Sequence, residues 1–136
     1  MKFVKIVLLI NGIVDVLTGI SLVFLPRLMA ALMDFPPMGD PAYYFAGGWG
    51  IAAICFGVAR IWASFIDKLV WYNVVLGALE GTILTIFSIV APFLYSSLGF
   101  TQVALSLAIG SIFGVIYLTL LIIKLVKKKE EEKAET

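Results

Sequence analysis

The sequence predicts an all-α, polytopic membrane protein: a bundle of four transmembrane helices with both termini in the cytoplasm. Of its 136 residues, 62% are hydrophobic and 14% are charged, and the mean hydropathy is +1.08, far above that of a water-soluble domain. The apolar residues form four runs of about 22 residues, each about 33 Å long as a helix and sufficient to cross a bilayer core. The runs lack the alternation of barrel strands, so helices are expected.

The first predicted span covers residues 4–25. Two lysines precede it, as in a secretory signal, but the run is longer than a signal core and contains Asn11 and Asp15. No clear small-x-small cleavage site follows, and Pro26 ends the run. We therefore expect a retained transmembrane helix rather than a cleaved signal peptide.

A short helix over residues 27–35 is expected on the outer membrane surface, because its leucines and methionines give it an apolar side and two prolines break it at position 36. The second span covers residues 42–63. Asp40 is a typical N-cap residue, and Pro41 follows at the first helical position. This pair predicts where the second span begins.

The third and fourth spans are predicted over residues 69–91 and 102–123, with Pro92 closing the third. Together the spans make residues 1–123 one transmembrane domain. Residues 124–136 are basic and then acidic, which is typical of a charged cytoplasmic tail. The tail is expected to fray into solvent, or else to touch anionic lipid heads through Lys127–Lys129.

Basic residues in the short flanking segments set the expected orientation. They gather at one end of the four spans, while the opposite end has only Arg27. The positive-inside rule therefore places both termini in the cytoplasm. We expect a multi-pass protein of the plasma membrane of a prokaryotic cell, and its expected partner is the lipid bilayer. The residues counted at the cytoplasmic end are Lys2, Lys5, Arg60, Lys68, Lys124, Lys127, Lys128 and Lys129.

Two acidic residues, Asp15 and Glu80, lie near mid-depth in the first and third spans, where an ionisable group is costly and is typically functional. Asn11 and Thr18 share a helix face with Asp15, and Asn73 shares one with Glu80, at spacings of three, four and seven residues. These five residues are the candidate ligands for an ion or small molecule. If the two faces meet, desolvation and mutual repulsion both favour the protonated forms, so at least one of the two carboxyls is expected to be neutral.

Arg60 is the sixth candidate, near the cytoplasmic end of the second span. Two interpretations stay open for it. Its side chain either snorkels to the lipid headgroups or turns inward and forms a salt bridge with a carboxylate.

Composition excludes several classes of site. The chain has no histidine and one cysteine, Cys55, so neither a disulfide framework nor a zinc or haem site is expected, and no metal or cofactor is predicted. A formal charge of +1 gives no argument for nucleic-acid binding. No phosphate-binding loop, nucleophile elbow or histidine pair indicates an enzyme.

The combination of Asn11, Gly12 and Asp15 in the first span, Arg60 after a glycine-rich second span and Glu80 in the third resembles small prokaryotic four-helix membrane proteins of the BphX-like kind. The resemblance extends over the whole chain. It implies the four-helix architecture and no particular activity, because such families largely lack an assigned one.

Three functions fit these observations. The first is a proton- or cation-linked transporter or channel subunit, which with four helices implies a homo-oligomer or larger complex. In the second, a structural or assembly role, the carboxyls are protonated hydrogen-bonding pins that hold helices in register. The third is a lipid- or quinone-binding protein, or else a membrane enzyme.

Overall fold

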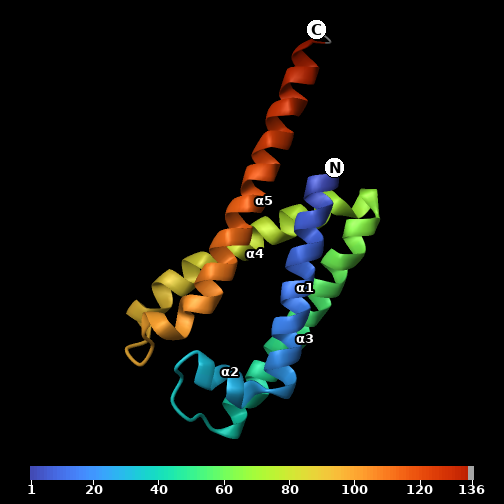
Figure 1. Ribbon diagram of the computed structural model, residues 1–136. Coiled ribbons are helices and arrows are strands. Elements are labelled where there is room, and N and C mark those ends of the chain that lie inside the picture. The colour runs from blue at the N-terminus through green and yellow to red at the C-terminus, as the bar shows by residue number, and fades with distance from the viewer. Residues whose placement is uncertain (135–136) are drawn as a thin grey trace.

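A computed structural model describes residues 1–134, which form five helices and no strand (Figure 1). A short second helix separates the first long helix from the other three. The five helices are α1 Lys2–Phe24, α2 Pro26–Leu32, α3 Asp40–Phe65, α4 Asp67–Leu94 and α5 Phe100–Ala134.

Four helices, α1, α3, α4 and α5, are long and apolar enough to cross a membrane. Large hydrophobic side chains cover their outer surfaces, which is the pattern expected of helices that contact lipid tails. The prediction of an all-α protein with four helices long and apolar enough to span a membrane is therefore confirmed, and these helices indicate a small multi-pass membrane protein.

Helices α1 and α3 pack antiparallel through two reciprocal glycine pairs. Gly12 faces Gly57, and Gly19 faces Gly50. Within each helix the two glycines are seven residues apart. A Cβ atom built on any of the four would lie 2.4–2.7 Å from the carbonyl oxygen of its partner. Only glycine permits this approach of two backbones, so the four glycines fix how α1 and α3 pair.

Helices α4 and α5 form the second antiparallel pair. Gly81 packs against the backbone of Gly114. The ring of Tyr117 occupies the space that a side chain at position 77 would need, and Gly77 has none. Towards the other end of the pair, the hydroxyls of Ser88 and Ser106 are 3.0 Å apart and hydrogen-bonded. Small residues and one interhelical hydrogen bond therefore hold this pair together.

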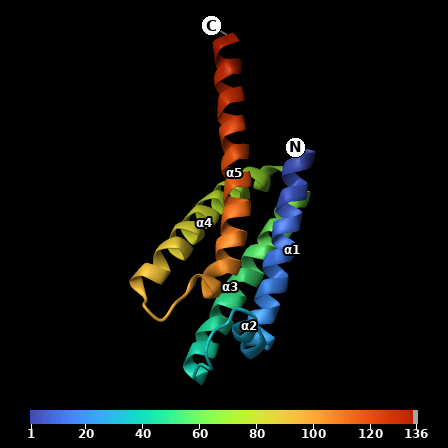
Figure 2. The same cartoon turned by 60° about the vertical axis from the view of Figure 1, so that its left-hand side comes forward.

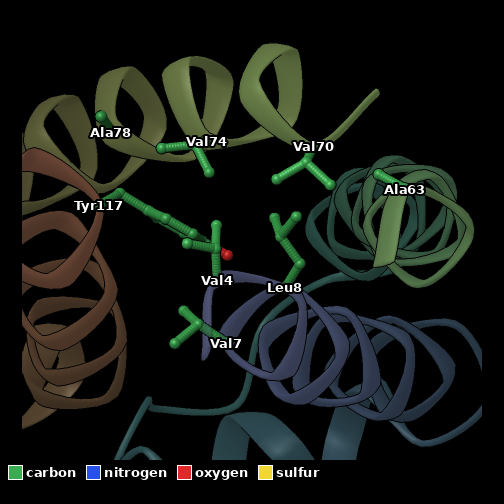
Figure 3. Close-up of a cluster of buried hydrophobic side chains, with 8 residues drawn as sticks. All are labelled: Val4, Val7, Leu8, Ala63, Val70, Val74, Ala78 and Tyr117. Atoms are coloured by element: carbon green, nitrogen blue, oxygen red, sulfur yellow. The ribbon is translucent and has the colours of Figure 1, made fainter. Parts of the chain in front are cut away.

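The two helix pairs meet at the end of the bundle where α1 begins and diverge towards the other end (Figures 1 and 2). A buried hydrophobic cluster fills the junction, with side chains from all four long helices (Figure 3). At the divergent end, Gln102 of α5 donates a 2.8 Å hydrogen bond to the carbonyl of Asp34, which follows α2. The cluster consists of Val4, Val7, Leu8, Ala63, Val70, Val74, Ala78 and Tyr117.

Several predicted boundaries are wrong by a few residues. Gly39, not Asp40, is the N-cap of α3, and α4 continues through Pro92 to Leu94. Only Ile66 separates α3 from α4. The hydropathy pattern marks the apolar residues, whereas helical hydrogen bonding continues into the polar residues that flank them.

The charged tail is helical as far as Ala134 rather than frayed, and residues 135–136 lie outside the described part of the chain. Both α1 and α5 have their chain-terminal ends on the same side of the bundle (Figures 1 and 2). Lys5 forms a 2.7 Å salt bridge with Asp67 on this side. Which side of a membrane this is stays a prediction.

Candidate functional site

Arg60 joins the two acidic residues. One terminal nitrogen of its guanidinium donates to Oδ2 of Asp15 in α1, and the other donates to Oε2 of Glu80 in α4. The side chain of Arg60 is only 2% exposed, so the inward salt bridge, not snorkelling, describes this residue. We call Asp15, Arg60 and Glu80 the triad.

The direction of α3 explains how Arg60 reaches Asp15. Gly57 faces Gly12, so Arg60, three residues further along, lies nearer the start of α1 than Asp15 does. Helical side chains lean towards the N-terminus of their own helix. Because α1 and α3 are antiparallel, the side chains of Asp15 and Arg60 lean towards each other along the seam.

Two further side chains extend the triad into a network. Asn11 donates through its amide nitrogen to Oδ1 of Asp15 at 3.1 Å, and the hydroxyl of Tyr117 donates to Oδ1 of Asn11 at 2.8 Å. Tyr117 is fully buried. The network therefore contains hydrogen bonds or ion pairs from all four long helices.

The triad has one positive and two acidic groups. If both carboxyls are ionised, its net charge is negative by one, which is costly in a low-dielectric interior. Asp15 is 13% exposed, whereas Glu80 is 40% exposed. Among the described residues Oε1 of Glu80 accepts no hydrogen bond, so Glu80 is the group that remains open to a proton or cation.

A cavity of about 210 Å³ lies beside the triad, between the diverging helix pairs. Asp15 and Glu80 are its ionisable lining groups, and its other walls are largely apolar. On the opposite side of the triad the hydrophobic cluster closes the bundle. The remaining lining residues are Thr18, Leu22, Met29, Met33, Trp49, Ala53, Leu84, Leu105, Ser106 and Ile109.

A second, much smaller void of about 20 Å³ touches Asn11 and all three triad residues. A polar void of this size has room for one water molecule. Nε of Arg60 is buried and has no hydrogen-bond partner among the described protein atoms, so it is a donor available to a water in this region.

The structure brings together four of the six predicted site residues: Asn11, Asp15, Arg60 and Glu80. Thr18 lines the cavity near Asp15. Asn73 does not join them, because its amide donates instead to the carbonyl of Leu69 in its own helix at 3.2 Å. It shares a face with Glu80 but lies seven residues, about 10 Å, away along the axis.

Tyr117 is the network residue that the sequence did not mark as functional. It shares a helix face with Gly110 and Gly114, which indicates helix packing, and nothing in its spacing distinguishes a hydrogen-bonding tyrosine from a space-filling one. The available signal was that a tyrosine hydroxyl buried within an apolar span needs a polar partner.

Among residues 1–134, no group of three or more histidine, cysteine, aspartate or glutamate side chains could hold a metal ion. The groups present offer two carboxyls, one guanidinium, an amide and a phenol. Their chemistry is ion pairing, proton exchange and hydrogen bonding.

No protein-family model, curated protein or solved structure matches this chain. The comparisons therefore identify no family, and the BphX-like resemblance stays a prediction. The four long apolar helices imply contact with a lipid bilayer and indicate a small four-span membrane protein.

Proposed function

We propose that this protein is a proton- or cation-linked membrane transporter or channel subunit, and that Asp15 and Glu80 exchange a proton for a cation. The observation that carries the proposal is the uneven charge of the triad beside an open cavity. Arg60 can neutralise one of the two carboxylates, and the other requires a proton or an external cation.

Access to the triad supports a carrier more than an open pore. The cavity approaches Asp15 and Glu80 from one side, while the hydrophobic cluster, including Leu8 and Tyr117, fills the bundle on the other side. A site open to one side and closed to the other is the arrangement that an alternating-access mechanism requires.

The test uses purified protein in liposomes that contain a pH-sensitive dye. A sodium or potassium gradient should drive proton movement in the opposite direction, and Glu80→Gln should reduce this movement to the level of protein-free liposomes. Glu130→Gln in the exposed tail removes the same charge outside the site and should leave it unchanged. Wild-type proton movement no greater than that of empty liposomes would contradict the proposal.

A structural role is the second candidate, because the network directly connects four helices. Proton movement, rather than folding stability, discriminates between the two in the variant Glu80→Gln. This variant leaves Asp15 and Arg60 as a balanced ion pair, so a purely structural network keeps its folding stability after this change. Under the transport proposal, the same variant folds normally and loses ion-coupled proton movement.

A further inference from the structure

The cavity beside the triad has a chemical character that narrows the class of cation. It is mostly lined by leucine, isoleucine, methionine and tryptophan side chains, and its ionisable groups are two carboxyls. A small hydrated metal ion would leave these apolar walls without a partner. A ligand with a charged head and an apolar body fits both parts.

From this arrangement we propose that the cavity binds a small organic ammonium ion, with its ammonium at Glu80 and Asp15 and its apolar body among the apolar walls. This inference rests on the proposed cation exchange and names its substrate class. The proposed ligand is a free small molecule.

The acceptor that favours an ammonium head is Oε1 of Glu80. Oε2 is already paired with Arg60, but Oε1 accepts no hydrogen bond among the described residues, and the carboxyl borders the cavity. A primary ammonium has three donors and one positive charge, so it supplies the missing hydrogen bond and balances the triad. The guanidinium of Arg60 is paired with both carboxylates, and its side chain is only 2% exposed.

The dimensions of the cavity favour a small body. Its volume of about 210 Å³ is below the roughly 300–1,000 Å³ typical of sites for drug-sized ligands. From Asp15 at one end to Leu22 in the same helix is about 10 Å along the axis. A single aromatic ring on a two-carbon chain is of this scale.

A phospholipid headgroup with a primary ammonium shares the head chemistry but not the rest. Its phosphate would lie close to the ammonium and would enter a site that already has an excess negative charge. The triad also lies deep along the spans, where burying a phosphate is costly. A free amphipathic amine is therefore the better match.

The experiment measures binding of 2-phenylethylammonium to the full chain in phosphatidylcholine nanodiscs, by calorimetry against protein-free nanodiscs. 2-Phenylethanol has the same body with an uncharged hydroxyl head and is the matched ligand control. We expect saturable binding of the ammonium, at least tenfold weaker binding of the alcohol, and at least tenfold loss of ammonium binding in Glu80→Gln.

Two alanines test whether the cavity holds the body of the ammonium ion. Ala53 lines the cavity, whereas its neighbour Ala52 is exposed on the outer surface of α3. Ala53→Leu fills the cavity without changing the triad, so it should weaken ammonium binding at least tenfold, and Ala52→Leu should not change it. Inorganic-cation-driven proton movement should survive in Ala52→Leu, whose side chain lies outside the cavity.

Equal binding of the ammonium and the alcohol, no saturable binding, or equal effects of Ala52→Leu and Ala53→Leu would overturn the inference. Loss of probe binding when phosphatidylethanolamine replaces phosphatidylcholine would also overturn it, because a lipid headgroup would then be the occupant. If proton movement driven by sodium or potassium persists in any of these cases, the proposed function stands without the ammonium site.

Discussion

At the scale of single residues, the cost of charge in a membrane made Asp15 and Glu80 recognisable from the sequence alone. The same reasoning left Arg60 undecided, because a position near the end of a span allows both snorkelling and pairing. The direction of α3 relative to α1 decided between them, because it places the side chain of Arg60 against that of Asp15.

Arg60 is expected to be the residue on which the stability of the network depends most. Arg60→Gln leaves two acidic groups close together without their counterion, and we expect it to lower the free energy of unfolding by about 3–5 kcal/mol. The triple variant Arg60→Gln, Asp15→Asn, Glu80→Gln removes all three charges and should recover much of this loss. Unfolding in mixed detergent micelles measures both.

Arg27 provides the matched control for this prediction. It also pairs with an aspartate, Asp40, but at 3.6 Å and with both side chains largely exposed. Arg27→Gln should therefore change the free energy of unfolding by no more than about 1 kcal/mol. If Arg27→Gln and Arg60→Gln were equally destabilising, the buried triad would not stabilise the fold more than an exposed ion pair does, and the prediction would be wrong.

At the scale of helices, hydropathy predicted the four spans, since each must be predominantly apolar over about 30 Å of hydrocarbon. It could not predict that α4 continues past Pro92, because a proline in the last turn removes only one backbone donor there. The pairing of α1 with α3 did have a sequence signal. Gly12 and Gly19 are seven residues apart, as are Gly50 and Gly57.

Two glycines of α3 test the close approach of α1. A Cβ at Gly57 would lie 2.6 Å from the carbonyl oxygen of Gly12, whereas nothing lies within 4 Å of a Cβ at Gly47. Gly57→Ala should reduce the free energy of unfolding by about 1–3 kcal/mol through overpacking. Gly47→Ala makes the same chemical change in open space and should not destabilise the protein.

The measurement is thermal unfolding of each purified variant in the same detergent, followed by helical circular dichroism. A lower midpoint for Gly57→Ala alone supports the close glycine contacts. A similar fall for Gly47→Ala would mean that the effect comes from losing a glycine in α3 and not from contact with α1.

At the scale of the whole molecule, the basic residues predict the orientation, and the structure adds that the ends of α1 and α5 lie on one side (Figure 2). The cytoplasmic assignment depends on the positive-inside rule. The arrangement of the two helix pairs was beyond the sequence, because lipid-facing and partner-facing apolar side chains have the same composition.

Single cysteines test this orientation in intact cells. In a Cys55→Ala background, a membrane-impermeant maleimide should label Ser97→Cys, in the segment between α4 and α5, before lysis. It should label Lys129→Cys, in the tail, only after lysis. The opposite pattern would invert the protein in the membrane, and labelling of both before lysis would contradict the four-span topology.

Helix α5 also has a mechanical consequence. It is unbroken from Phe100 to Ala134, so the wall residue Ile109 and the charged residue Lys128 belong to one rod. They are 19 residues apart, about 28 Å along the axis. If α5 tilts by about 5° about Ile109, this length of helix displaces Lys128 by about 2.5 Å. A change in the tilt of α5 at the cavity is thus amplified at the aqueous tip, where a soluble protein could detect it.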